Sequence, residues 1–63
     1  MLKTLMRVLK ILYLFDPNMD IWTDTDMIGF RIDPDTVPEK TMHMLNELGV
    51  EYNPFYSSLV MYI

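Results

Sequence analysis

Apolar residues at the start of the chain recur with the spacing of an amphipathic helix. Six of them follow the i, i+3, i+4, i+7 pattern: Leu2, Leu5, Met6, Leu9, Leu12 and Tyr13. The basic residues Lys3, Arg7 and Lys10 line the opposite side. The pattern predicts a helix over about residues 2–15. It should end at Asp16, because a residue before proline is driven out of the α region.

Residues 19–32 alternate as two strands of a hairpin. A loop centred on Thr25 and Asp26 would pair Asp20 with Arg31, Ile21 with Phe30, Trp22 with Gly29, and Thr23 with Ile28. In that register apolar residues face each other, an acid faces a base, and the indole can lie over a glycine. A shift of one residue destroys all four matches. Thr-Asp lacks the Asn-Gly chemistry of tight turns, so a wider loop with the same register is the alternative.

A second helix is predicted over about residues 36–48. Thr36 and Glu39 have the spacing of a capping box, and Pro38 is acceptable in a first turn. Its expected inward stripe is Val37, Thr41, Met44, Leu45 and Leu48. Gly49 suits the position just after the helix, with Val50 placed for the hydrophobic contact that accompanies such an end.

Two C-terminal strands follow, about 50–52 and 59–63, around a turn that contains Asn53 and Pro54. The last strand, LVMYI, is apolar at every position, which suggests that it is covered on both faces. The chain is therefore expected to be one domain, residues 1–63, of the α+β class. Its order is α-β-β-α-β-β, with a mostly antiparallel sheet of three to four strands packed by two helices.

Two short helices can cover one sheet face well, but hardly both. Val60 and Tyr62 would then lie on the uncovered side of the last strand, where a second copy or a partner protein could bury them. This predicts a possible homodimer through the C-terminal strand. The alternatives are one helix on each face, or a Tyr62 that is simply a half-exposed strand residue.

Composition limits the classes of function. The chain has 63 residues, is 51% hydrophobic and contains no cysteine, so disulfides, thiolate nucleophiles and cysteine metal sites are excluded. The longest apolar run, Ile11–Phe15, is far shorter than the ~20 residues of a membrane span. Charges interrupt residues 1–15 and no cleavage site follows, so no signal peptide is expected and a cytoplasmic setting fits.

The net charge of −4 is unevenly distributed. Residues 1–15 hold three bases and no acid, whereas residues 16–63 hold nine acids against Arg31 and Lys40. An acidic body disfavours nucleic acid, whose affinity comes mostly from phosphate neutralisation. Lys3, Arg7 and Lys10 are therefore the only candidate nucleic-acid-binding residues, in an alternative function as a nucleic-acid-binding regulator.

The stretch from Asp16 to Met27 partly resembles a calcium loop. Acids or amides occupy loop positions 1, 3, 5 and 9, namely Asp16, Asn18, Asp20 and Asp24. Ile21 stands where glycine permits the bend, and Met27 where a glutamate should close the site, so no metal is predicted. His43 is the sole histidine, and Ser57 and Ser58 have no identified base. We therefore expect no catalytic residue, no cofactor and no enzymatic activity.

An acidic recognition face is the stronger prediction for the same stretch. An inward Trp22 would turn Asp20 and Asp24 toward the core, where unpaired carboxylates are costly. An outward Trp22 among aspartates would suit binding, since tryptophan is enriched in hot spots. The expected partner-binding residues are Asp20, Trp22, Asp24, Asp26 and Tyr62. The alternative places Trp22 flat against Gly29 and Arg31 with no partner.

The aromatic residues near the C-terminus form a second group, Tyr52, Phe55, Tyr56 and Tyr62. Core packing is the default for them, with a partner-binding patch as the alternative. Together these features predict a small acidic interaction module, an inhibitor or regulator that binds a basic surface of another protein. Phage-encoded inhibitors offer an analogy in size and charge.

DNA mimicry is a more specific version of that function. Fully extended, residues 16–26 would spread four charges over roughly 36 Å, or one per ~9 Å. Duplex DNA carries one charge per about 1.7 Å. Mimicry would thus require the fold to gather further acids on the same surface, drawn from Asp33, Asp35, Glu39, Glu47 and Glu51.

Overall fold

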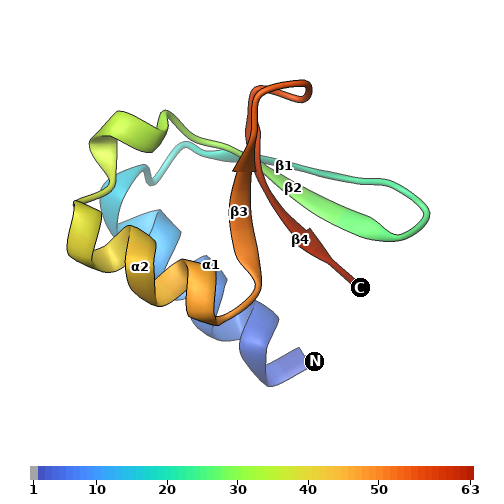
Figure 1. Ribbon diagram of the computed structural model, residues 1–63, viewed down its shortest axis with the longest axis horizontal. Helices are drawn as coiled ribbons and strands as arrows, with labels where there is room; N and C mark the ends of the chain where they lie inside the picture. Colours follow the sequence, from blue (N-terminus) through green and yellow to red (C-terminus); the bar gives the residue numbers. More distant parts are fainter. Residues whose placement is uncertain (1) are drawn as a thin grey trace.

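The computed structural model describes residues 2–63 and has an α+β fold of two α-helices and a four-stranded antiparallel sheet (Figure 1). The elements in chain order are α1 (Leu2–Phe15), β1 (Asp20–Thr23), β2 (Met27–Arg31), the 3-10 helix η1 (Pro34–Thr36), α2 (Glu39–Glu47), β3 (Val50–Asn53) and β4 (Ser58–Tyr62). The predicted order of helices and strands, α-β-β-α-β-β, is confirmed. Within residues 2–63, neither helix is long and apolar enough to cross a membrane.

The sheet has the strand order β1-β2-β4-β3, so β1 and β3 are its two edges. The first hairpin has the predicted register, with Asp20 opposite Arg31 and Trp22 opposite Gly29. The Asp24 amide donates to the Met27 carbonyl at 2.9 Å, which encloses Thr25 and Asp26 in a tight loop. The side-chain pattern thus set the register in spite of the unfavourable turn residues.

Both helices cover the same face of the sheet (Figure 1). Val8 and Leu12 of α1 and Leu45 of α2 are fully buried in one cluster. The same cluster contains Phe30 of β2 and Leu59 of β4, which share the inner face of the sheet. The structure is therefore two-layered, and the alternative with one helix on each face is wrong.

The second helix begins three residues later than predicted, at Glu39. Asp33 caps a separate turn, η1, by accepting a hydrogen bond from the Asp35 amide at 2.9 Å. The Thr36 hydroxyl donates to the carbonyl of Asp33 instead of capping α2. Val37 is extended because it precedes Pro38, so the helix cannot include it.

The inward stripe of α2 also differs from the prediction. Leu45 is buried, and Met42 and Leu48 pack against the core at i, i+3 spacing on either side of it. That spacing turns Met44 outward, where it is 44% exposed. Gly49 ends the helix as predicted, with a left-handed φ of 92° that glycine adopts without a Cβ penalty.

The C-terminal strand is partly covered on the face away from the helices. Val60 is fully buried within the chain itself, whereas Tyr62 is half exposed. Because β4 pairs with β2 on one side and β3 on the other, it has no free edge for a second copy. Of the two residues expected to be uncovered, only Tyr62 is therefore accessible to a second copy, and the homodimer through the C-terminal strand stays a prediction.

Candidate interaction surface

The face of the sheet opposite the helices, here termed the outer face, contains three of the five predicted partner-binding residues. Directly opposed strand residues share a face. The register therefore places on the outer face Asp20, Trp22, Met27, Gly29, Arg31, Glu51, Asn53, Ser58, Val60 and Tyr62. Asp24 and Asp26 lie in the loop at the end of the same hairpin. The Ile63 amide donates to the Asp26 carbonyl at 2.9 Å, which keeps this loop beside the C-terminal strand.

Trp22 is held over Gly29 on this face. A Cβ atom built on Gly29 would lie 1.9 Å from Cε2 of the indole and 2.3 Å from its Nε1. No side chain fits there, so the glycine is what lets the ring approach the backbone. Trp22 is half-buried as a result, with its ring on the side away from the helices.

The indole reaches across β2 to the third strand of the sheet. Its Nε1 donates a hydrogen bond to Ser58 Oγ at 3.0 Å, and Ser58 Oγ donates in turn to the Tyr56 carbonyl at 2.9 Å. Ser58 is fully buried, and no buried side-chain polar atom in residues 2–63 lacks a partner. Trp22 is thus anchored by a polar contact as well as by packing.

The loop between β3 and β4 adds two aromatic rings to Trp22. The amide of Tyr56 donates to the Asn53 carbonyl at 3.2 Å, and that of Phe55 donates to Asn53 Oδ1 at 3.0 Å. The Trp22 and Tyr56 ring centroids are 5.1 Å apart, and Phe55 meets Tyr56 edge-on at 4.9 Å. These three residues form the aromatic cluster, which runs from the half-buried Trp22 to a Phe55 that is 84% exposed.

The contact between the two aromatic groups depends on the fold. The sequence groups Phe55 and Tyr56 with Tyr52 and Tyr62, but Tyr52 is opposite Leu59 and therefore on the inner face. Only the folded Asn53-Pro54 loop lays Tyr56 against Trp22. The glycine opposite the tryptophan indicates from the sequence only that the indole covers β2.

Acidic side chains lie on the same side of the sheet as the aromatic cluster. Asp20 and Glu51 lie on the two edge strands of the outer face, and Asp24 and Asp26 lie in the β1–β2 loop, all of them exposed. Arg31 is the only base among the outer-face strand residues. Four acids against one base leave this side of the molecule negative. The structure therefore places the aromatic cluster on an acidic side of the sheet.

The calcium-like spacing of the first loop does not produce a common centre. Asp16 Oδ1 accepts a hydrogen bond from the Asn18 amide at 3.0 Å, a local turn contact. Asp20 lies in the extended β1 strand, beyond that turn. Within residues 2–63 there is no group of three or more His, Cys, Asp or Glu side chains that could hold a metal ion.

The basic residues of α1 are on the opposite side of the molecule. Arg7 and Lys10 line a cavity of about 430 Å³ between the two helices, together with Glu47 of α2. Lys3 is exposed on the same helix, and His43 is exposed on α2. The basic stripe of α1 thus has an acid beside it, which weakens its field toward phosphates.

The remaining acids are distributed over several surfaces. Asp35 and Glu39 lie beside η1 and the start of α2, whereas Glu47 lies between the helices. Only Glu51 joins Asp20 on the outer face. Asp35, Glu39 and Glu51 line one groove, and DNA mimicry stays a prediction.

Comparison with protein-family models, with curated proteins and with solved structures finds no match for this chain. Two surfaces combine shape with charge: the outer face with its aromatic cluster, and a groove beside the edge strand β3.

Proposed function

We propose that this protein is a non-enzymatic interaction module that binds a basic surface of another protein through the outer face of its sheet. The observation that carries the proposal is the aromatic cluster, in which Phe55 is 84% exposed while packed edge-on against Tyr56. The cluster supplies the centre of the interface. Asp20, Asp24 and Asp26 supply its rim, with Tyr62 half exposed at the end of β4.

The anchoring of the cluster supports this role. Immobilising a flexible side chain on binding costs about 0.5–1.5 kcal/mol, and part of that cost is already met when a ring is packed in the free protein. Trp22 is fixed by Gly29 and Ser58, and Tyr56 is fixed against Trp22. Rigid aromatic side chains of this kind are enriched in the central hot spots of protein interfaces.

The charge of the rim determines the kind of partner. Acids around an aromatic centre attract a surface that carries Lys or Arg around an apolar or aromatic depression, and they accelerate encounter with it. A protein bound in this way covers the basic surface of its partner. The module would then act as an inhibitor or regulator by keeping anionic ligands from that surface.

The proposal is tested by capture of cell proteins on immobilised wild-type protein and on matched variants. Phe55→Ala removes the most exposed ring of the aromatic cluster, whereas Tyr13→Ala removes an exposed ring from α1 and serves as the control. A partner of this surface is captured by wild type and by Tyr13→Ala, and lost with Phe55→Ala. A variant that combines Asp20→Asn with Asp24→Asn should capture less of the partner than wild type does. Equal capture by all variants would contradict the proposal.

The nucleic-acid alternative is addressed by one additional measurement. Binding of DNA and RNA is assayed at several salt concentrations with wild type and with an Arg7→Gln, Lys10→Gln variant. A specific use of the basic stripe would give a steep loss of affinity with salt, by roughly one power of salt concentration per phosphate contact. Such a loss, abolished in the variant, would replace the proposal by the nucleic-acid function.

A further inference from the structure

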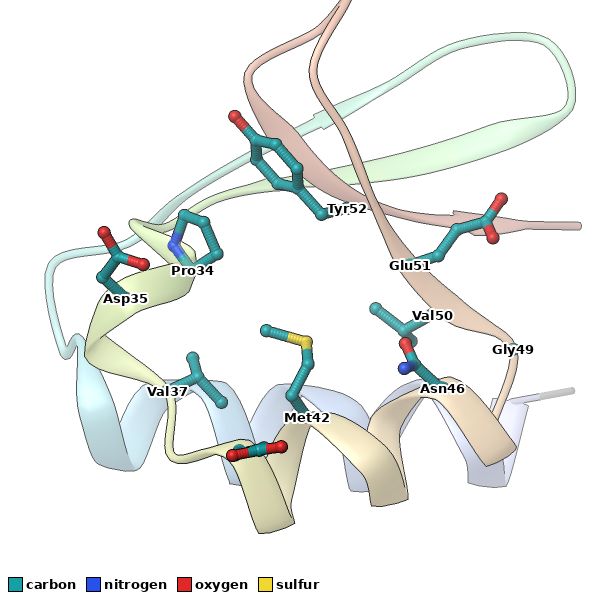
Figure 2. A pocket seen from close by; sticks show the side chains of 10 residues that line it. Pro34, Asp35, Val37, Met42, Asn46, Gly49, Val50, Glu51 and Tyr52 are labelled. Carbon is teal, nitrogen blue, oxygen red and sulfur yellow. The ribbon is translucent and has the colours of Figure 1, made fainter.

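A groove of about 760 Å³ runs between β3 and the segment formed by η1 and α2 (Figure 2). Its apolar lining comes from Val37 and Met42 on one side and from Val50 and Tyr52 on the other. Figure 2 shows Met42 directed into the groove and the Tyr52 ring extended over it toward Pro34. Tyr52 is 43% exposed and Met42 is partly exposed, whereas Val37 and Val50 are buried, so Tyr52 and Met42 are the accessible part of the apolar lining.

The wall of this groove is an unpaired sheet edge. Residues 49–52 all line it, which is expected when a groove runs along a strand rather than across it. Since β3 is hydrogen-bonded only to β4, every second residue of β3 directs its amide and carbonyl away from the sheet. The four residues of β3 offer about 13 Å of such edge.

The side chains of β3 alternate between two environments. Val50 and Tyr52 are on the inner face, beside the groove, whereas Glu51 points to the outer face (Figure 2). An added strand would alternate in the same way, because opposed residues share a face. One set of its side chains would enter the groove beside Met42, and the other would lie next to Glu51.

The groove is also strongly acidic. Its lining contains Asp35, Glu39 and Glu51 and no basic residue. Asp35 and Glu39 are exposed beside the inner side of the groove, and Glu51 is exposed on its outer side. A segment that occupies this groove is therefore expected to carry a positive charge.

We propose that β3 binds an extended basic segment of another protein, which adds to the sheet as a fifth strand and alternates apolar with Lys or Arg residues. Main-chain hydrogen bonds to the open edge of β3 provide the affinity of this mode of recognition, and alternate side chains provide its specificity. Apolar side chains contact Val37, Met42 and Tyr52. Basic side chains on the outer face pair with Glu51 across the strands, an arrangement that stabilises strand pairing.

A second copy of this chain is a poorer occupant. Each copy carries a net charge of −4, and pairing of two β3 strands would bring the acidic grooves of both copies together. Like charges placed across paired strands are destabilising. The proposal therefore commits to a basic partner segment, and self-association becomes an outcome that would overturn it.

The test uses a capped hexapeptide of alternating valine and lysine, added to the ¹⁵N-labelled full chain. Amide resonances of residues 49–53 should shift, and the binding constant follows from the titration. Two control peptides separate the contribution of charge from that of main-chain hydrogen bonds. One has glutamate in place of lysine, and the other has alternate backbone amides N-methylated. Each control should bind at least about tenfold more weakly, since one reverses the charge and the other removes main-chain donors. Equal binding of all three peptides would overturn the proposal.

Matched variants locate the site. Glu51→Lys and Asp20→Lys both reverse an exposed acid on an edge strand of the outer face, but only Glu51 is on β3. Glu51→Lys should weaken the valine-lysine peptide by about three- to tenfold, because an opposed unlike pair becomes a like pair. Asp20→Lys should change the affinity for the valine-lysine peptide by less than about twofold. A larger loss of affinity with Asp20→Lys than with Glu51→Lys would overturn the proposal. So would resonance shifts confined to β1, or dimers in sedimentation.

This inference is independent of the proposed function. Phe55→Ala should leave the affinity for the valine-lysine peptide unchanged, since Phe55 does not line the groove. A wild-type protein that captures a partner but does not bind the valine-lysine peptide would overturn only the strand-addition site. A wild-type protein that binds this peptide, while capture is equal for wild type and Phe55→Ala, would overturn only the outer-face function.

Discussion

The indole of Trp22 lies over Gly29, so close that a Cβ atom on the glycine would lie 1.9 Å from Cε2 of the ring. This contact explains how a sheet with helices on only one side avoids an uncovered apolar face. Val60 stands next to Gly29 in the same cross-strand row and is fully buried, although no helix covers it. The indole lies over the neighbouring Gly29 on this side of the sheet, and Tyr56 packs against the indole.

Gly29→Ala should lower the free energy of unfolding by about 1–3 kcal/mol, because the added methyl group forces the indole away from the strand. Urea unfolding monitored by circular dichroism measures the change, and Trp22 fluorescence reports the displacement of the ring. A double-mutant cycle supplies the control. In a Trp22→Ala background the same substitution should cost nothing or stabilise, since alanine suits a strand better than glycine. Equal costs in both backgrounds would contradict the steric explanation.

Ser58→Ala should destabilise the protein by about 1–2 kcal/mol, because it removes the acceptor of the Trp22 Nε1 hydrogen bond. The change is measured by chemical denaturation. In a Trp22→Phe background the indole N–H is absent, so Ser58→Ala should there cost clearly less. The same loss in both backgrounds would show that the partly buried hydrogen bond contributes nothing to stability.

Substitutions at two residues with a left-handed backbone should change the stability of the protein in opposite directions. Ser57 has a φ of 51° and Gly49 a φ of 92°. Ser57→Gly should stabilise by up to about 1 kcal/mol, and Gly49→Ala should destabilise by about 1 kcal/mol. Nothing lies within 4 Å of a Cβ at Gly49, so the cost there is conformational rather than steric. Thermal unfolding midpoints that move in the same direction for both would contradict this account.

Phe55→Ser should leave the free energy of unfolding within about 0.5 kcal/mol of wild type, because the ring is 84% exposed. Phe30→Ala serves as the contrasting variant, since Phe30 is fully buried and its loss should cost about 3–5 kcal/mol. Denaturation curves of the two variants are compared with wild type. A large destabilisation by Phe55→Ser would mean that Phe55 holds the loop in place and is not free for a partner.

The hairpin was predictable because its two strands are short and close in sequence. Only one register opposes Asp20 to Arg31 and Trp22 to Gly29, so side-chain complementarity alone specifies it. The end of α2 was predictable for an equally local reason, because Gly49 occupies a backbone conformation that other residues adopt at a cost. The beginning of α2 was not predictable, because the capping-box spacing of Thr36 and Glu39 does not reveal that Asp33 caps a separate turn, η1, ahead of the helix.

The sequence by itself determined the elements, their order and the pairing of the first hairpin, since these depend on periodicity and on contacts between near neighbours. Tertiary structure alone decided where the functional surfaces are. Trp22 and Ser58 are 36 residues apart, yet one hydrogen bond joins them across three strands. The groove likewise requires η1, α2 and the edge of β3 to be placed together. Contacts at such separations depend on how the layers pack, which no local pattern of residues encodes.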